Sequence, residues 1–109
     1  MEYKGTQTHV SGGWDTIITA AAGKVNIVKL IQATNVTGSL TSIEVAISGS
    51  GTEDRFYLAK DVGIASQASY VVVDDPVVLE AGTHLQAKAS INNGLDLVVS
   101  YLQASASIV

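Results

Sequence analysis

Polar and apolar residues alternate with a period of two along several short runs of this chain, and amphipathic helical spacing is absent. In residues 84–91, every second residue from Leu85 to Ile91 is apolar and the residues between them are polar. Residues 95–101 repeat the pattern, with apolar side chains at every second position from Leu95 to Tyr101. Successive side chains of a strand point to opposite sides, so each run predicts a half-buried β-strand.

The segment between these two runs is Asn92-Asn93-Gly94. Asn-Gly between alternating apolar runs is the strongest short-range signal for a tight turn that joins two neighbouring strands. The sequence therefore predicts that residues 84–91 and 95–101 pair as an antiparallel hairpin.

Further runs of the same kind, separated by Gly-rich or Pro-containing turns, cover residues 16–20, 24–35, 43–48, 55–58, 69–73 and 77–79. Residues 24–35 are apolar on both faces, which predicts either a bulge that switches the faces or a strand covered on both sides. Residues 62–65 fit a short strand or a helical turn. About eight short strands with frequent turns predict an all-β fold, a single antiparallel β-sandwich of jelly-roll-like form.

The length of 109 residues suits one domain. Residues 1–13 are polar, contain Gly5, Gly12 and Gly13, and alternate little. We expect them to form an extended N-terminal arm whose first ten residues can be removed without unfolding the protein. Residues 14–103 form the expected β-sandwich domain, and residues 104–109 an expected C-terminal tail.

Charged residues make up only 15% of the chain, against about 25% in typical domains. A surface so poor in charge predicts contact with a partner, including other copies of the chain, and we expect a homo-oligomer, specifically a trimer. The net charge of −4 and the scattered Lys and Arg residues lack the clustered basic footprint of nucleic-acid binding. No apolar run approaches the roughly 20 residues that span a bilayer, so no membrane partner is expected.

The chain has no cysteine, which excludes disulfides and thiolate chemistry. Its N-terminus lacks the apolar core of a signal peptide. We therefore expect synthesis in a cytoplasm, unless an export segment was removed.

Three segments resemble the turns and strands of small phage virion proteins: residues 21–25 (Ala-Ala-Gly-Lys-Val), 79–85 (Leu-Glu-Ala-Gly-Thr-His-Leu) and 98–102 (Val-Val-Ser-Tyr-Leu). The resemblance covers roughly residues 14–103, and it departs at Ala22, where Pro is common, and at Thr83, where an acidic residue is common. These β-sandwich proteins serve as capsid decoration or cement proteins, head–tail joining proteins and tail proteins. The resemblance implies a structural protein of the virion, made in the host cytoplasm and bound to the major capsid protein or other virion proteins.

No residue pattern predicts an enzyme or a cofactor site. A phosphate-binding loop ending at Gly23-Lys24 would need Gly at the position of Ile18 and Ser or Thr at that of Val25. His84 and Asp75 would need an oriented serine, and the chain has no Gly-x-Ser-x-Gly turn. The glycosylation-type triplet Asn35-Val36-Thr37 is expected to be a chance match at a strand end.

Acidic residues at Glu53-Asp54, Asp61 and Asp74-Asp75 lack EF-hand spacing. Acids in turns usually face solvent or cap backbone amides, so no metal is predicted. A calcium site assembled from separate loops stays open as an alternative.

The candidate partner-binding residues lie in and beside the expected arm: Tyr3, His9, Val10 and Trp14. We interpret the chain as a capsid decoration protein whose arms extend over neighbouring subunits, with a head–tail joining or tail protein as the alternative. Trp14 either closes one end of the sandwich or anchors a partner. A carbohydrate-binding module at a fibre tip is a further alternative, favoured if Trp14, Tyr57 and Tyr70 share an exposed face.

Overall fold

The computed structural model describes residues 2–49 and 55–105, and these residues form β-strands without any helix. None of the described segments is therefore a helix long and apolar enough to cross a membrane. The strands are β1 (Glu2–Val10), β2 (Asp15–Thr19), β3 (Lys24–Asn35), β4 (Thr41–Ser48), β5 (Arg55–Ile64), β6 (Ser69–Val73), β7 (Val77–Leu79), β8 (His84–Ala89) and β9 (Leu95–Ser105).

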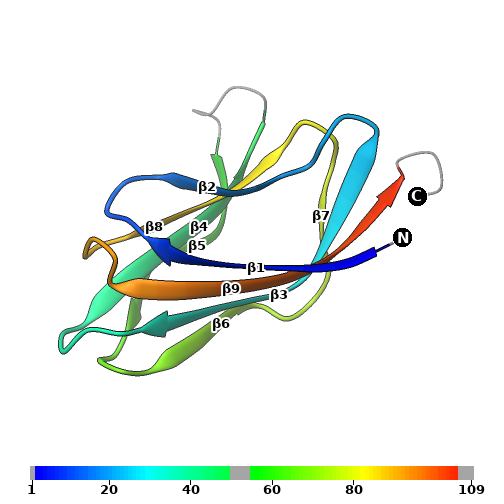
Figure 1. Ribbon diagram of the computed structural model, residues 1–109. Coiled ribbons are helices and arrows are strands. Elements are labelled where there is room, and N and C mark those ends of the chain that lie inside the picture. The colour runs from blue at the N-terminus through cyan, green and yellow to red at the C-terminus, as the bar shows by residue number, and fades with distance from the viewer. Residues whose placement is uncertain (1, 50–54, 106–109) are drawn as a thin grey trace.

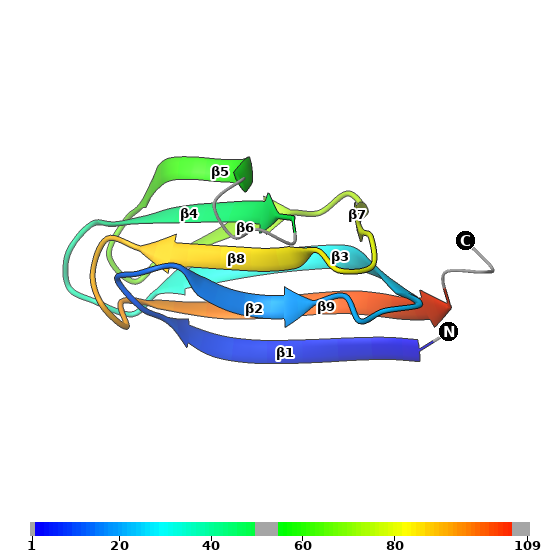
Figure 2. The same ribbon diagram turned by 90° about the horizontal axis from the view of Figure 1, so that it is seen from above.

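Two antiparallel sheets form a β-sandwich, as the alternation predicts (Figures 1 and 2). Sheet A has the order β1-β9-β3-β6, with β7 also paired to β3, and sheet B has the order β2-β8-β4-β5. Six of the eight connections between consecutive strands pass from one sheet to the other, so most strands that follow each other in sequence lie in opposite sheets.

The core between the sheets is built from the inward positions of the alternating strands. Leu85, Ala87 and Ala89 of β8 point into it from sheet B, and Leu97 and Val99 of β9 point into it from sheet A. The remaining large side chains that are fully buried in this core are aliphatic: Val10, Val28, Ile31, Ile43, Val45, Leu79 and Leu95.

A bulge in β3 confirms one of the two predictions for residues 24–35. The pairing of β3 with β9 shifts between Val28 and Leu30, and Lys29 at the shift is exposed. Core positions are even-numbered before the bulge, at Val28, and odd-numbered after it, at Ile31 and Ala33. The extra residue explains why both faces of this run contain apolar side chains.

The predicted hairpin of residues 84–91 and 95–101 is wrong. Strand β8 pairs with β2 and β4 in sheet B, whereas β9 pairs with β1 and β3 in sheet A. Asn93 in the turn adopts a left-handed conformation, with φ 57°. However, its amide donates to the carbonyl oxygen of Val10 at 2.9 Å, and the two strands separate to face each other across the core. Alternation is the same in both arrangements, so it does not distinguish them.

The structure also corrects the expectation of an N-terminal arm. Residues 2–10 form β1, the edge strand of sheet A, and β1 pairs with β9 from Glu2↔Gln103 to Val10↔Leu95. Alternation is weak because an edge strand buries little: Val10 is its only buried residue. At the other end, β9 extends to Ser105, and residues 106–109 of the expected tail lie outside the described residues, as does Met1.

Residues 55–58 and 62–65, expected as separate elements, lie largely in the single strand β5. Its pairing with β4 shifts register between Ile43 and Val45 and again between Val45 and Ala46, and Asp61 has a φ of 51°. The bend at Asp74-Asp75-Pro76 separates β6 from β7, as predicted.

Candidate functional site

The four predicted partner-binding residues do not form one surface. Tyr3 is 81% exposed on the outer face of sheet A, and His9 is exposed on the same face near the other end of β1. Trp14, just before β2, is half-buried and contacts side chains of sheet B. Val10 lies in the core with no exposed surface, because its position opposite Leu95 faces sheet B, so it offers no contact to a partner.

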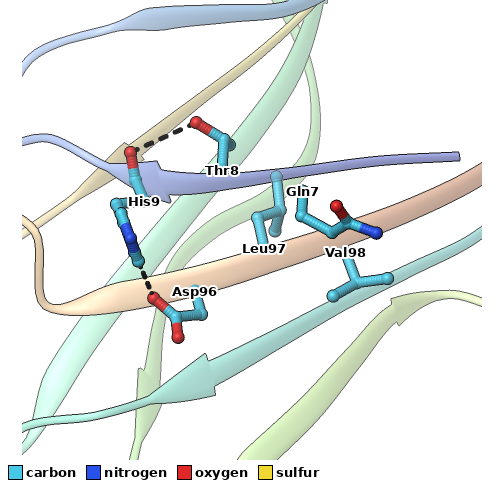
Figure 3. Close-up of a pocket in the computed structure, with 6 residues that line it drawn as sticks. All are labelled: Gln7, Thr8, His9, Asp96, Leu97 and Val98. Atoms are coloured by element: carbon cyan, nitrogen blue, oxygen red, sulfur yellow. Dashed lines mark hydrogen bonds and ion pairs between the residues drawn. The ribbon is translucent and has the colours of Figure 1, made fainter.

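His9 and Asp96 face each other across β1 and β9, as Figure 3 shows. The His9 Nδ1 and Asp96 Oδ1 atoms are 2.6 Å apart, and the side chains are 76% and 43% exposed. They border an open hollow of about 300 Å³, whose other lining residues are Gln7, Thr8, Leu97 and Val98. Exposed pairs of this kind contribute only about 0–1 kcal/mol to stability.

The described histidines lack the neighbours that nucleophilic catalysis requires. His84 Nδ1 lies 2.8 Å from Thr19 Oγ1, and no carboxylate of the described residues holds the imidazole. His9 has a carboxylate neighbour but no hydroxyl within hydrogen-bonding distance of its ring among the described residues. A hydrolytic triad needs a nucleophile, a base and an orienting acid hydrogen-bonded in a row, and neither histidine has both partners within the part of the chain that the structure describes.

The outer face of sheet A carries an apolar row that spans four strands. Cross-strand pairing places Tyr3 of β1 beside Leu102 of β9, Leu102 beside Ile27 of β3, and Ile27 beside Val78 of β7. Val78 is 50% exposed, and two further exposed valines, Val71 and Val98, extend this face. We call the set Tyr3, Leu102, Ile27 and Val78 the apolar row.

The face becomes polar toward the opposite end of the strands. There His9 contacts Asp96, and Thr34 Oγ1 lies 2.8 Å from Ser69 Oγ. The outer surface of sheet A is thus apolar near the start of β1 and hydrogen-bonded near its end. Sequence reasoning selected Tyr3 but missed the rest of the row, because Ile27 and Leu102 belong to strands whose two faces are both apolar.

The outer face of sheet B carries a cluster of aromatic and cationic side chains. The Arg55 Cζ atom lies 4.4 Å from the centre of the Trp14 ring, and Lys60 Nζ lies 4.8 Å from the centre of the Tyr57 ring. The two rings are 6.0 Å apart and tilted by 57°. We call Trp14, Arg55, Tyr57 and Lys60 the cation–aromatic cluster.

Gln86 holds the arginine of this cluster in place. Its side chain is only 3% exposed, and its Oε1 accepts a hydrogen bond of 3.0 Å from Arg55 Nε. Its Nε2 donates to Thr16 Oγ1 at 3.3 Å, so the amide is fixed from both ends. Arg55 therefore has its Nε bonded and its Cζ atom over the Trp14 ring.

The aromatic side chains do not form the sugar platform considered from sequence. Tyr70 lies on β6 in sheet A, away from Trp14 and Tyr57. Arg55 covers a face of the Trp14 ring, and the tilt between the rings prevents a flat surface. Stacking on a sugar needs an open ring face.

The described residues contain no group of three or more histidine or acidic side chains that could hold a metal ion. Asp61 lies in β5 and Asp74 and Asp75 lie in the bend after β6, so they do not come from one loop. Glu53 and Asp54, the other acids considered for calcium, lie outside the described residues.

No protein-family model matches the sequence, and no curated protein matches it either. Among solved structures, the fold is similar to the nucleoplasmin-like N-terminal domain of Drosophila FKBP39, with a TM-score of 0.50 and 9% identity over 94% of this chain and 88% of that domain. This likeness concerns the fold alone.

Structures of infectious bursal disease virus are also similar, at TM-scores of 0.34. The Gx strain structure is 12% identical over 95% of this chain and the Gt strain structure 9% identical over 95%. This chain spans about a third of those viral chains, 34% and 36% of their lengths. At these values the likeness identifies no shared function.

Proposed function

We propose that this chain is a structural protein of a virus particle, and specifically a decoration protein that bridges coat subunits on an assembled phage capsid. The carrying observation is the apolar row on sheet A, which leaves Tyr3 81% and Val78 50% exposed on one face of a rigid sandwich. Large apolar patches on soluble domains mark interaction surfaces.

The sequence supports the same proposal through its resemblance to small phage virion proteins and its low content of charged residues, 15%. The role needs no catalysis. The sandwich supplies a rigid shape, and the apolar row supplies buried area when it lies on another protein. The stabilising contact is then removal of apolar surface from water, about 25 cal/mol per Å².

The proposed occupant of the apolar row is the surface of the coat lattice. The outer face of sheet A is apolar at one end of its strands and hydrogen-bonded at the other, at Thr34 and Ser69, so a single face offers both apolar and polar contacts. Protein interfaces commonly combine the two kinds of contact.

The experiment is to purify particles and to locate and count this chain in them by imaging and quantitative mass spectrometry. Hundreds of copies distributed over the shell are expected. A few copies confined to the neck or tail would contradict the decoration role and favour the alternative, a head–tail joining or tail protein.

A paired substitution tests the surface itself. Tyr3→Asp combined with Val78→Asp should abolish incorporation into particles while leaving the fold unchanged, because both side chains are exposed. The matched control is Val36→Asp, since Val36 is 51% exposed but lies outside the apolar row. Equal incorporation of both variants would exclude this face as the binding surface.

A further inference from the structure

The cation–aromatic cluster lies on the last strand of sheet B, away from the apolar row. Arg55, Tyr57 and Lys60 all belong to β5, which pairs with β4 on one side only. Figure 2 shows β5 at the border of the sandwich, with no other strand beyond it in its sheet. An edge strand presents unpaired backbone N–H and C=O groups that can accept another strand.

The cations of the cluster lack an acidic partner among the described residues. The ion pair found there is His9 with Asp96, on the opposite sheet, and neither Arg55 nor Lys60 has a carboxylate within ion-pair distance. Glu44 also lies on this outer face, opposite Lys88 in the pairing of β4 with β8, but it forms no ion pair with either cation. The net charge of the chain is −4 and Asp61 follows Lys60 in β5, yet among the described residues neither cation is paired with a carboxylate.

Two contacts restrict the side chain of Arg55 in a conformation that can bind a ligand. Gln86, 3% exposed, accepts from its Nε, and its Cζ lies over the Trp14 ring, so the guanidinium is held before any ligand arrives. Neither interaction uses the terminal nitrogens, which can donate two hydrogen bonds to a carboxylate. Holding a side chain in its bound geometry reduces the entropy lost on binding.

The next residue along β5 adds an apolar element. Phe56 is 71% exposed and alternates to the opposite side of the strand from Arg55 and Tyr57. The edge of β5 therefore offers positive charge on one side and a large aromatic ring on the other.

We propose that β5 binds an extended acidic segment of a partner protein, which pairs with its free edge as an added strand. Alternate side chains of such a segment point to opposite sides. Acidic residues at every second position meet Arg55 and Lys60, and the apolar residues between them contact Phe56. The recognised pattern is an alternation of acidic and apolar residues. This inference does not depend on the apolar row or on the decoration role.

The test uses the fluorescence of Trp14, which is the single tryptophan of the chain and belongs to the cluster. The full-length protein is titrated with a blocked hexapeptide that alternates Glu and Val, and with the same peptide carrying Gln in place of Glu. The Glu peptide should change the Trp14 signal saturably, and the Gln peptide should bind at least about tenfold more weakly, because charge-assisted hydrogen bonds are lost. Equal binding of the two peptides would overturn the proposal.

Variants then assign the contact. Arg55→Gln and Lys60→Gln should each weaken binding of the Glu peptide, whereas the matched control Lys24→Gln, an exposed lysine at the start of β3, should not. Amide hydrogen exchange along β5 should slow in the presence of the peptide, which an added strand requires. Binding without this protection, or equal binding of inorganic phosphate or a sulfated saccharide, would indicate a general anion site and refute strand addition.

Discussion

Two buried asparagines of β3 are in opposite hydrogen-bonding situations. Asn35 Nδ2 donates to the carbonyl oxygens of Ser39 and Ile64 at 2.7 and 2.9 Å. Its Oδ1 accepts from the backbone amide and the hydroxyl of Thr37 at 2.9 and 2.8 Å. Asn26 is equally buried, but neither side-chain polar atom has a hydrogen-bond partner. Asn35 thus holds the loop before β4 in place through hydrogen bonds. Asn26 destabilises the folded protein, because its buried amide has lost its hydrogen bonds to water without gaining others.

Substitutions at these two positions should change the free energy of unfolding in opposite directions. Asn35→Ala should lower the free energy of unfolding by at least about 1–3 kcal/mol, because buried groups lose their partners. Asn26→Leu, which has the same number and branching of side-chain heavy atoms, should raise it, because it removes a desolvated amide. Chemical denaturation monitored by circular dichroism measures both. A loss of stability in Asn26→Leu would show that this amide has a partner in the folded protein.

The burial of Asn35 also bears on the glycosylation-type triplet that it begins. An enzyme that modified the amide nitrogen would have to break both of its hydrogen bonds and expose a side chain that has no accessible surface. The sequence alone also predicts a chance match, because the triplet lies at the end of a predicted strand. The triplet identifies residue types, and only the fold determines that the asparagine side chain points inward.

At the scale of elements, local pattern predicted strands well and their partners poorly. The runs around Leu85 and Leu97 lie in strands whose buried faces are those that alternation predicts. The bulge that switches the buried face of β3 is one of the two arrangements that its pattern predicts. The hairpin at Asn93-Gly94 was wrong because pairing is decided by distant contacts. The amide of Asn93 bonds to Val10, more than eighty residues earlier in the chain.

Local sequence pattern also fails to predict the two proposed binding surfaces, because each depends on contacts between distant residues. Tyr3 and Trp14 were identified because isolated aromatics in a polar segment are conspicuous. The apolar row needs the register of four strands, and the cation–aromatic cluster brings Trp14, just before β2, against side chains of β5. Neither combination is adjacent in sequence, so no local pattern contains it.

We predict that strand β1 is needed for the stability of the sandwich. Deleting residues 2–10 should destabilise the protein, in contrast to the expectation for an arm, because Val10 alone contributes about 1.5–3 kcal/mol by burial. The deletion also exposes the long edge of β9, which favours aggregation. Deleting only residues 2–4, all exposed, is the control and should change the melting temperature little. If both deletions leave the melting temperature unchanged, β1 contributes no more to stability than an arm would.

At the scale of the whole molecule, the two proposed interaction surfaces lie on opposite sheets. The apolar row lies on the outside of sheet A, and the cation–aromatic cluster lies on the outside of sheet B. One copy can therefore contact two neighbours at once. We expect such a chain to form homo-oligomers, with a trimer as the specific expectation, which sedimentation velocity of the purified protein measures directly.

The proposed decoration role predicts that binding depends on assembly of the capsid. A domain of 11.3 kDa has little surface, so one copy on one coat subunit should bind weakly. Contact with several subunits of an assembled lattice makes the later contacts intramolecular and raises the overall affinity without new chemistry. The protein should therefore bind assembled, expanded capsids and fail to bind isolated coat subunits, as cosedimentation can measure.

Binding to the assembled state alone also stabilises that state by mass action. At a free concentration one hundred times the dissociation constant, each occupied site contributes about 2.7 kcal/mol. Added protein should raise the temperature at which capsids rupture in a thermal-shift assay, and the Tyr3→Asp, Val78→Asp variant should not. Because apolar burial carries the contact, the effect should persist when salt shortens the range of electrostatic forces to about 3 Å at 1 M. A stabilisation that disappears in high salt would instead assign the contact to charged groups, and equal binding to isolated coat subunits would contradict bridging.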